Sequence, residues 1–146
     1  MHHSRMTVLV ILVPEAEILV KPFRDDYDPS AAEGMPAHIT VLYPFESQPV
    51  GSDSISRLQH LFADHLPFFY SLDKISRFPR TLYLTLSPED PLRELVDAVS
   101  KEFPQTPPYG GLFPDVIPHL TVAEVTDPEQ IDEIADEFNL ACEGQL

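Results

Sequence analysis

The sequence has a single cysteine, no apolar run long enough to cross a membrane and few basic residues. Cys142 alone cannot form an internal disulfide or a cysteine-rich metal site, so the composition favours the reducing cytoplasm. The apolar run at 7–13 is too short to span a bilayer, and the segment at 14–17 that follows it lacks a small-x-small cleavage pattern. We therefore interpret this run as a buried β-strand and expect no association with membranes.

Positive charge is scarce, because 9 Lys and Arg stand against 24 Asp and Glu and give a formal net charge of −15. Such a surface repels a long phosphate backbone, which argues against wrapping long DNA or RNA by counterion release. A small anion held in a local pocket is compatible with this charge. The chain has 146 residues, of which 43% are hydrophobic, as expected for one globular domain.

Hydrophobic periodicity predicts alternating strands and helices. Strands are expected at 6–13, 37–45, 68–78, 81–86 and around the motif at 118–125, and helices at 14–26, 53–65, 87–103 and 127–138. The order strand, helix, loop, strand occurs in 6–45 and again in 81–125. This repetition suggests a duplicated unit with approximate two-fold symmetry.

The helices carry recognisable signals at their ends and faces. Ser87 is predicted to cap the third helix, with Pro88 at its first position, and Asp127 with Pro128 repeats this arrangement in the last helix. Spacing also predicts one buried stripe on the helix at 53–65, formed by Ile55, Leu58, Phe62 and Leu66.

Two stretches share an unusual pattern: PAHITVLY at 36–43 and PHLTVAEV at 118–125. Each has a proline, then His, an aliphatic residue, Thr and Val. On a strand, residues i and i+2 point to the same face, so His38 projects with Thr40 and His119 with Thr121. The simplest alternative is a half-exposed strand whose outer face carries His and Thr by chance.

Two imidazoles facing one site suit phosphodiester cleavage. Histidine titrates near neutrality, so one ring can accept a proton while the other donates one. Threonine hydroxyls can donate hydrogen bonds to the non-bridging phosphate oxygens. A zinc site would need a nearby Cys, Asp or third His, and the motifs supply none, so we expect neither a metal nor a cofactor.

The pair AHITVLY and PHLTVAE resembles the two signature motifs of the two-histidine phosphoesterase superfamily, which includes the 2′-5′ RNA ligase-like proteins and cyclic phosphodiesterases. The segments at 28–45 and 107–111 look like a bacterial branch of it. The resemblance implies an α+β fold that is bilobal, with two antiparallel sheets and outer helices related by approximate two-fold symmetry, and an active cleft between the lobes. We expect a single domain at 1–146, with lobes at about 1–50 plus part of the C-terminal region, and at 66–125.

The resemblance also implies a metal-independent phosphodiesterase that hydrolyses a cyclic nucleotide phosphate or a 2′,3′-cyclic-phosphate RNA end. In that pattern His38 is the proton donor, His119 the acceptor that activates water, and Thr40 and Thr121 the phosphate ligands. Tyr109 lies in the glycine-rich loop before the second motif and is our first choice for stacking on a base. A non-catalytic nucleotide- or phosphate-binding module and a 2′-5′ RNA ligase are the alternatives.

The sequence departs from that family in two places. The arginine that many relatives have after the second motif is missing, so Lys74, Arg77 and Arg80 are candidates for the positive charge at the phosphate. Relatives also continue into a closing strand where this chain ends. That difference predicts either a truncated chain or an open sheet edge through which a homodimer forms.

Overall fold

Strand pairing organises the fold. The computed structural model describes residues 7–106 and 117–142. Its strands are β1 (Leu9–Leu12), β2 (His38–Leu42), β3 (Ser71–Phe78), β4 (Thr81–Ser87) and β5 (His119–Glu124). They form a five-stranded sheet in the order β1-β2-β5-β4-β3, in which the pairs β2/β5, β5/β4 and β4/β3 are antiparallel. Each strand coincides with a run that the sequence predicted.

The α+β class is confirmed, but the expectation of two sheets is wrong for the described strands. The reason is that the two motif strands, β2 and β5, are hydrogen-bonded directly to each other. This pairing joins β1 and β2 on one side with β5, β4 and β3 on the other into one sheet. The two-fold symmetry, the cleft and the predicted lobe boundaries stay predictions.

Within the described ranges, the helical segments are the 3₁₀ turn Pro14–Ala16, α1 (Glu17–Tyr27), α2 (Pro29–Ala32), α3 (Ser52–Ala63), α4 (Asp90–Glu102) and α5 (Pro128–Cys142). The predicted start of α5 is confirmed, because Asp127 Oδ1 accepts a hydrogen bond from the Glu129 backbone N–H at 3.0 Å. The predicted Ser87 cap is wrong. Ser87 is the last residue of β4, paired with Ser71 of β3, so α4 begins three residues later.

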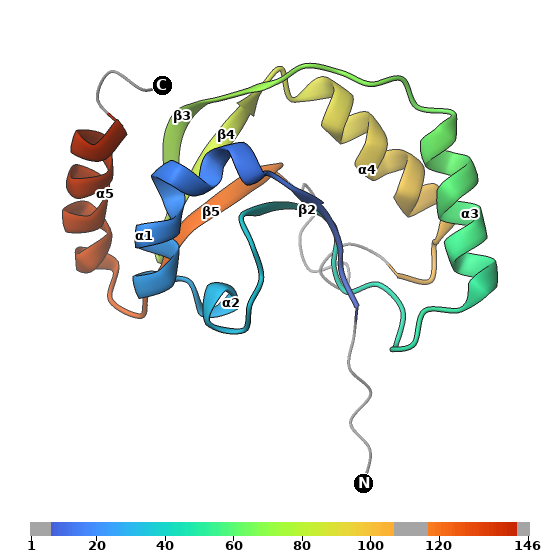
Figure 1. Ribbon diagram of the computed structural model, residues 1–146, viewed down its shortest axis with the longest axis horizontal. Coiled ribbons are helices and arrows are strands. Elements are labelled where there is room, and N and C mark those ends of the chain that lie inside the picture. Colours follow the sequence, from blue (N-terminus) through green and yellow to red (C-terminus); the bar gives the residue numbers. More distant parts are fainter. Residues whose placement is uncertain (1–6, 107–116, 143–146) are drawn as a thin grey trace, which may run out of the picture. The chain divides into compact units, whose positions relative to one another are not determined.

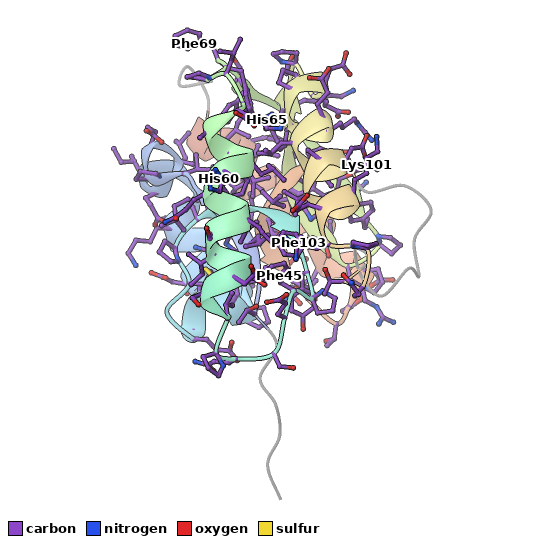
Figure 2. The ribbon with its side chains drawn as sticks, turned by 90° about the vertical axis from the view of Figure 1, so that its right-hand side faces the viewer. Phe45, His60, His65, Phe69, Lys101 and Phe103 are labelled. Carbon is purple, nitrogen blue, oxygen red and sulfur yellow. The ribbon has the colours of Figure 1, made fainter. Side chains whose placement is uncertain are left out.

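Contacts divide the chain into two units, each with its own core. The first comprises the described residues of Met1–Val10, Thr40–Phe69 and Pro88–Pro118, with α3 beside α4 (Figure 1). Phe45 and Phe103 meet edge to face in its interior, with ring centroids 4.9 Å apart (Figure 2). The Arg57 guanidinium lies 4.4 Å from the centre of the Phe103 ring, and its Nε donates to Glu102 Oε1 at 2.9 Å. This contact ties the middle of α3 to the end of α4.

The predicted apolar stripe on α3 is only partly correct. Leu58 is 8% exposed, whereas Ile55 and Phe62 are 45% and 41% exposed. The buried face of α3 is instead defined by Leu58 and Ser54, one turn apart, and the Ser54 hydroxyl donates to Glu46 Oε2 at 2.8 Å. Hydrophobic periodicity predicted that Ile55 would be buried, but the polar neighbour Ser54 is buried in its place.

The second unit comprises the described residues of Ile11–Ile39, Tyr70–Ser87 and His119–Leu146. In it α1 packs against β5 and α5, and α5 against β4, so the helices cover one face of these strands (Figure 1). Phe23 of α1 and Phe138 of α5 meet edge to face at 5.1 Å. The residues between helices and strands are almost fully buried: Val20, Ile39, Leu84, Leu120, Val122, Ile131, Ile134 and Phe138. Each large apolar side chain among them contributes about 1.5–3 kcal/mol of burial free energy.

Among the described strands, β1 and β3 lie at the edges of the sheet. β3 has a register irregularity between Leu72 and Lys74 and carries Arg77 further along. Bulges and basic side chains are features by which edge strands discourage pairing with another chain. The homodimer through an open edge stays a prediction. No helix within the described ranges is long and apolar enough to cross a membrane.

Candidate active site

The two histidine motifs lie on the neighbouring strands β2 and β5, and His38, Ile39 and all of β5 belong to the second unit. In the antiparallel pair β2/β5, Ile39 is directly opposite Leu120, and both are fully buried. Directly opposite residues share a face of the sheet and successive residues alternate, so His38 and His119 share the other face. The same register sets Thr121 opposite His38. His119 is the diagonal neighbour of His38, and diagonal neighbours in an antiparallel pair have Cα atoms about 7–8 Å apart. All three side chains are half-buried.

Thr40 follows His38 by two residues on β2, so the two side chains project from the same face of that strand. It is also half-buried, between the fully buried Ile39 and the 4% exposed Val41. The alternation that the sequence predicted for both motifs is therefore present.

A hydrogen bond fixes which nitrogen of His38 is available for chemistry. Its Nδ1 lies 2.9 Å from the Pro36 carbonyl oxygen. A carbonyl oxygen can only accept, so Nδ1 carries a hydrogen and donates it. Proton transfer to or from a substrate must then use Nε2, as an acceptor in the neutral ring and as a donor in the imidazolium.

A buried ion-pair network holds the segment that leads into His38. Arg24 of α1 is 2% exposed, and its Nε donates to Asp28 Oδ2 at 3.0 Å. Its Nη2 donates to Ser30 Oγ at 3.2 Å and to the Met35 carbonyl at 2.8 Å. The second carboxylate oxygen of Asp28 accepts from the Ser30 backbone N–H at 3.0 Å and so caps α2. No polar side-chain atom buried in the described residues lacks a partner.

This network controls the position of the Pro36 carbonyl. On one side of Pro36, Arg24 binds the Met35 carbonyl; on the other, the Ala37 backbone N–H donates to Glu17 Oε1. Gly34 turns the chain at φ 94°, in the left-handed region that glycine adopts most readily. Both neighbours of Pro36 are thus fixed to α1, and through Pro36 so is the His38 ring.

Aromatic rings surround His119. The imidazole centroid lies 5.1 Å from the Tyr83 ring and 5.8 Å from the Phe78 ring, both in edge-type arrangements. Tyr83 is 4% exposed and pairs with Thr121 across β4/β5, whereas Phe78 is 37% exposed. These contacts restrict the orientations that the His119 ring can adopt.

The structure separates the three basic residues that the sequence offered as phosphate ligands. Arg77 forms an ion pair with Asp132 of α5, on the face that the helices cover. Arg80 lies in the turn between β3 and β4. Lys74 is paired with Thr85, which is in turn paired with His119, so Lys74 is on the histidine face.

Two other residues were singled out from the sequence. Tyr109 lies outside the described residues. Cys142 is buried in α5, and burial raises the pKa of its thiol, which makes it a poor nucleophile. In the part of the chain that the structure describes, no group of three His, Cys, Asp or Glu residues has the arrangement of a metal site.

A family model described as the 2′-5′ RNA ligase superfamily matches residues 12–144, a range that includes both histidine motifs. The chain belongs to this superfamily. No curated protein matches the sequence. The match confirms the resemblance drawn from AHITVLY and PHLTVAE. The two-histidine phosphoesterases, to which the 2′-5′ RNA ligase superfamily belongs, are enzymes, and membership implies an RNA or nucleotide substrate.

Sequence reasoning missed the residues that position His38 in this 2′-5′ RNA ligase superfamily member. Arg24 and Asp28 are spaced i, i+4 at the end of α1, but so are the exposed Lys21 and Asp25. Asp28 followed by Pro29 and Ser30 is a helix-capping signal that was available in the sequence. Burial distinguishes the two ion pairs, and burial is not visible in their spacing.

We expect Arg24→Met to destabilise the protein by about 3–5 kcal/mol, because Asp28 would lose its charged partner inside the protein. Lys21→Met is the matched control on the same helix. Its ion pair with Asp25 has the same 3.0 Å separation but is 63% and 51% exposed, so its loss should cost about 0–1 kcal/mol. Urea denaturation measures both. Equal losses would contradict a special role for the buried pair.

Proposed function

We propose that this protein is a metal-independent phosphodiesterase that hydrolyses a cyclic nucleotide phosphate or a 2′,3′-cyclic-phosphate RNA end. The observation that carries the proposal is the register of β2 and β5. Because Ile39 is opposite Leu120, two histidines and Thr121 share one face of adjacent strands in one unit. If these strands carried His and Thr on a half-exposed face by chance, we would not expect two imidazoles and a hydroxyl to be neighbours on adjacent strands.

In the proposed reaction His119 accepts a proton from water as the water oxygen forms a bond to phosphorus. The bond between phosphorus and one ribose oxygen breaks, and the His38 imidazolium donates its Nε2 proton to that oxygen. The product is a phosphomonoester, and proton exchange with solvent restores both rings. The hydrogen bond from Nδ1 to Pro36 supports the role of His38, because it leaves Nε2 as the donor.

Thr40 and Thr121 are proposed as ligands of the phosphate. Each lies two residues beyond its histidine on the same strand face, so its hydroxyl is close to the ring that transfers the proton. Donation to the non-bridging oxygens would orient the phosphorus for in-line attack and stabilise the charge that develops on those oxygens.

Two other functions remain to be separated by experiment. A binding module would hold the same nucleotide without turning it over. An RNA ligase would join an end carrying a 2′,3′-cyclic phosphate to a 5′-hydroxyl end. The net charge of −15 favours small substrates over long ones. Incubation with cyclic nucleotides, and with pairs of oligonucleotide ends, distinguishes hydrolysis, joining and binding alone.

Replacement of either histidine by Ala should lower kcat/KM for a nucleoside 2′,3′-cyclic phosphate by about 10²–10⁴-fold, because each ring transfers a proton in the transition state. His60→Ala on α3 is the control, since His60 is an exposed histidine in the other unit, and its activity should match the parent. Assays contain EDTA, which should leave turnover unchanged. Two results would refute the mechanism. One is a His38→Ala, His119→Ala double variant with the activity of the parent, and the other is loss of the parent's activity in EDTA.

The pH dependence of kcat/KM should be bell-shaped, because one histidine must be protonated and the other neutral. The rate falls at low pH when the base is protonated and at high pH when the acid has lost its proton. Initial rates across pH 4–10 with the parent protein measure this. A profile that rises to a plateau with a single titration would leave only one of the two histidines in proton transfer.

Thr121→Val and Thr40→Val should each raise the activation free energy by about 2–4 kcal/mol, the scale of one lost transition-state hydrogen bond. Valine keeps the shape of threonine, so folding should be little affected. Thr126→Val, at an exposed position just beyond β5, is the control and should retain parent kinetics. If both motif variants behave like this control, the hydroxyls do not bind the phosphate.

A further inference from the structure

The histidine face of the sheet continues across two more strands of the second unit. Thr85 of β4 is opposite His119, and Lys74 of β3 is opposite Thr85. In the next row, Tyr83 is opposite Thr121. Directly opposite residues share a face, so a row of imidazole, hydroxyl and ammonium groups crosses β5, β4 and β3.

Among the described residues of β3, β4 and β5, Lys74 is the cation on the histidine face. β3 has two basic residues, Lys74 and Arg77. Because they are three positions apart on the strand, Arg77 projects from the opposite face, where it pairs with Asp132 of α5. Lys74 is exposed and forms no ion pair with any carboxylate whose side chain the structure describes. In a chain with 9 Lys and Arg, most of the basic side chains on helices are instead engaged by acids, as Lys21, Arg24, Arg57 and Arg93 are.

The separation between Lys74 and His119 matches the size of a nucleotide. Two strand spacings set their Cα atoms about 10 Å apart. Thr85 lies between them, and its hydroxyl hydrogen is directed to the Lys74 carbonyl oxygen at 3.3 Å. The oxygen of Thr85 is then left as an acceptor for a hydroxyl or amino group of a substrate that extends along the row.

We infer that Lys74 binds a second phosphate of the substrate, one nucleotide length from the phosphate that is cleaved. This inference rests on the proposed function and narrows it: the preferred substrate is a ribonucleotide that has a 5′-phosphate or 5′-phosphodiester in addition to its cyclic phosphate. A nucleoside cyclic phosphate without that group leaves Lys74 unused. The competing explanation is that Lys74 only protects the edge strand β3 from pairing with other chains.

Steady-state kinetics with two probes separate these explanations. The probes are adenosine 2′,3′-cyclic phosphate and the same compound with a 5′-phosphate. The parent should favour the 5′-phosphorylated probe in kcat/KM by about tenfold, the value of one charge-assisted hydrogen bond, mainly through KM. Lys74→Gln should abolish this preference and Lys74→Arg should retain most of it. Lys101→Gln, at an exposed lysine on α4 in the other unit (Figure 2), should keep it fully.

An equilibrium measurement keeps this inference independent of catalysis. Calorimetry compares adenosine 2′-monophosphate with adenosine 2′,5′-bisphosphate, neither of which contains a cyclic phosphate to hydrolyse. The parent should bind the bisphosphate about tenfold more tightly, and Lys74→Gln should remove the difference. A difference that persists in Lys74→Gln, or is absent in the parent, overturns the role of Lys74. Discrimination by the parent without turnover would instead refute the hydrolase and leave the Lys74 site standing.

Discussion

The buried ion pair between Arg24 and Asp28 is the constraint on which the geometry of the first histidine depends. Burial of two charges is costly, and their mutual attraction compensates only when the remaining donors and acceptors are also satisfied. Here the guanidinium reaches Asp28, Ser30 and the Met35 carbonyl, and Asp28 also caps α2. The network therefore fixes the backbone of residues 28–37 in one conformation. The His38 ring donates a hydrogen bond to the Pro36 carbonyl oxygen, which lies between the anchored residues Met35 and Ala37.

Strand register supplies the second condition. A slip of one residue between β2 and β5 would turn one histidine toward the helices and remove the paired arrangement. Such a slip would also expose one of the fully buried residues Ile39 and Leu120 to the polar face. The apolar packing of α1 and α5 on β5 and β4 thus protects the alignment of the polar groups on the other side. Stability on one face and the proposed chemistry on the other both depend on the same register.

The histidines have different surroundings, which fits different tasks. His38 is held by a hydrogen bond to the backbone, which commits Nδ1 and leaves Nε2 for the proton transfer that we propose. His119 is held by the rings of Tyr83 and Phe78, which orient it by packing. Membership of the 2′-5′ RNA ligase superfamily implies an RNA or nucleotide substrate, which we propose to bind this face. The row from His119 to Lys74 indicates in which direction such a ligand would extend.

The sequence by itself determined the strands, most of the helices and the two motifs, because strand alternation and helix capping depend on residues close together in the chain. It gave no means to distinguish the Arg24–Asp28 pair from the Lys21–Asp25 pair, since both have the same spacing on one helix. Nor did it reveal that β2 pairs directly with β5 in one sheet, or that Lys74 rather than Arg77 shares the histidine face. The positions of β2 and Lys74 relative to His119 depend on the pairing of β2 and of β4 with β5, and β5 lies more than 30 residues further along the chain than either strand. Tertiary structure decided them because the free energies of burial and register belong to contacts that local sequence does not contain.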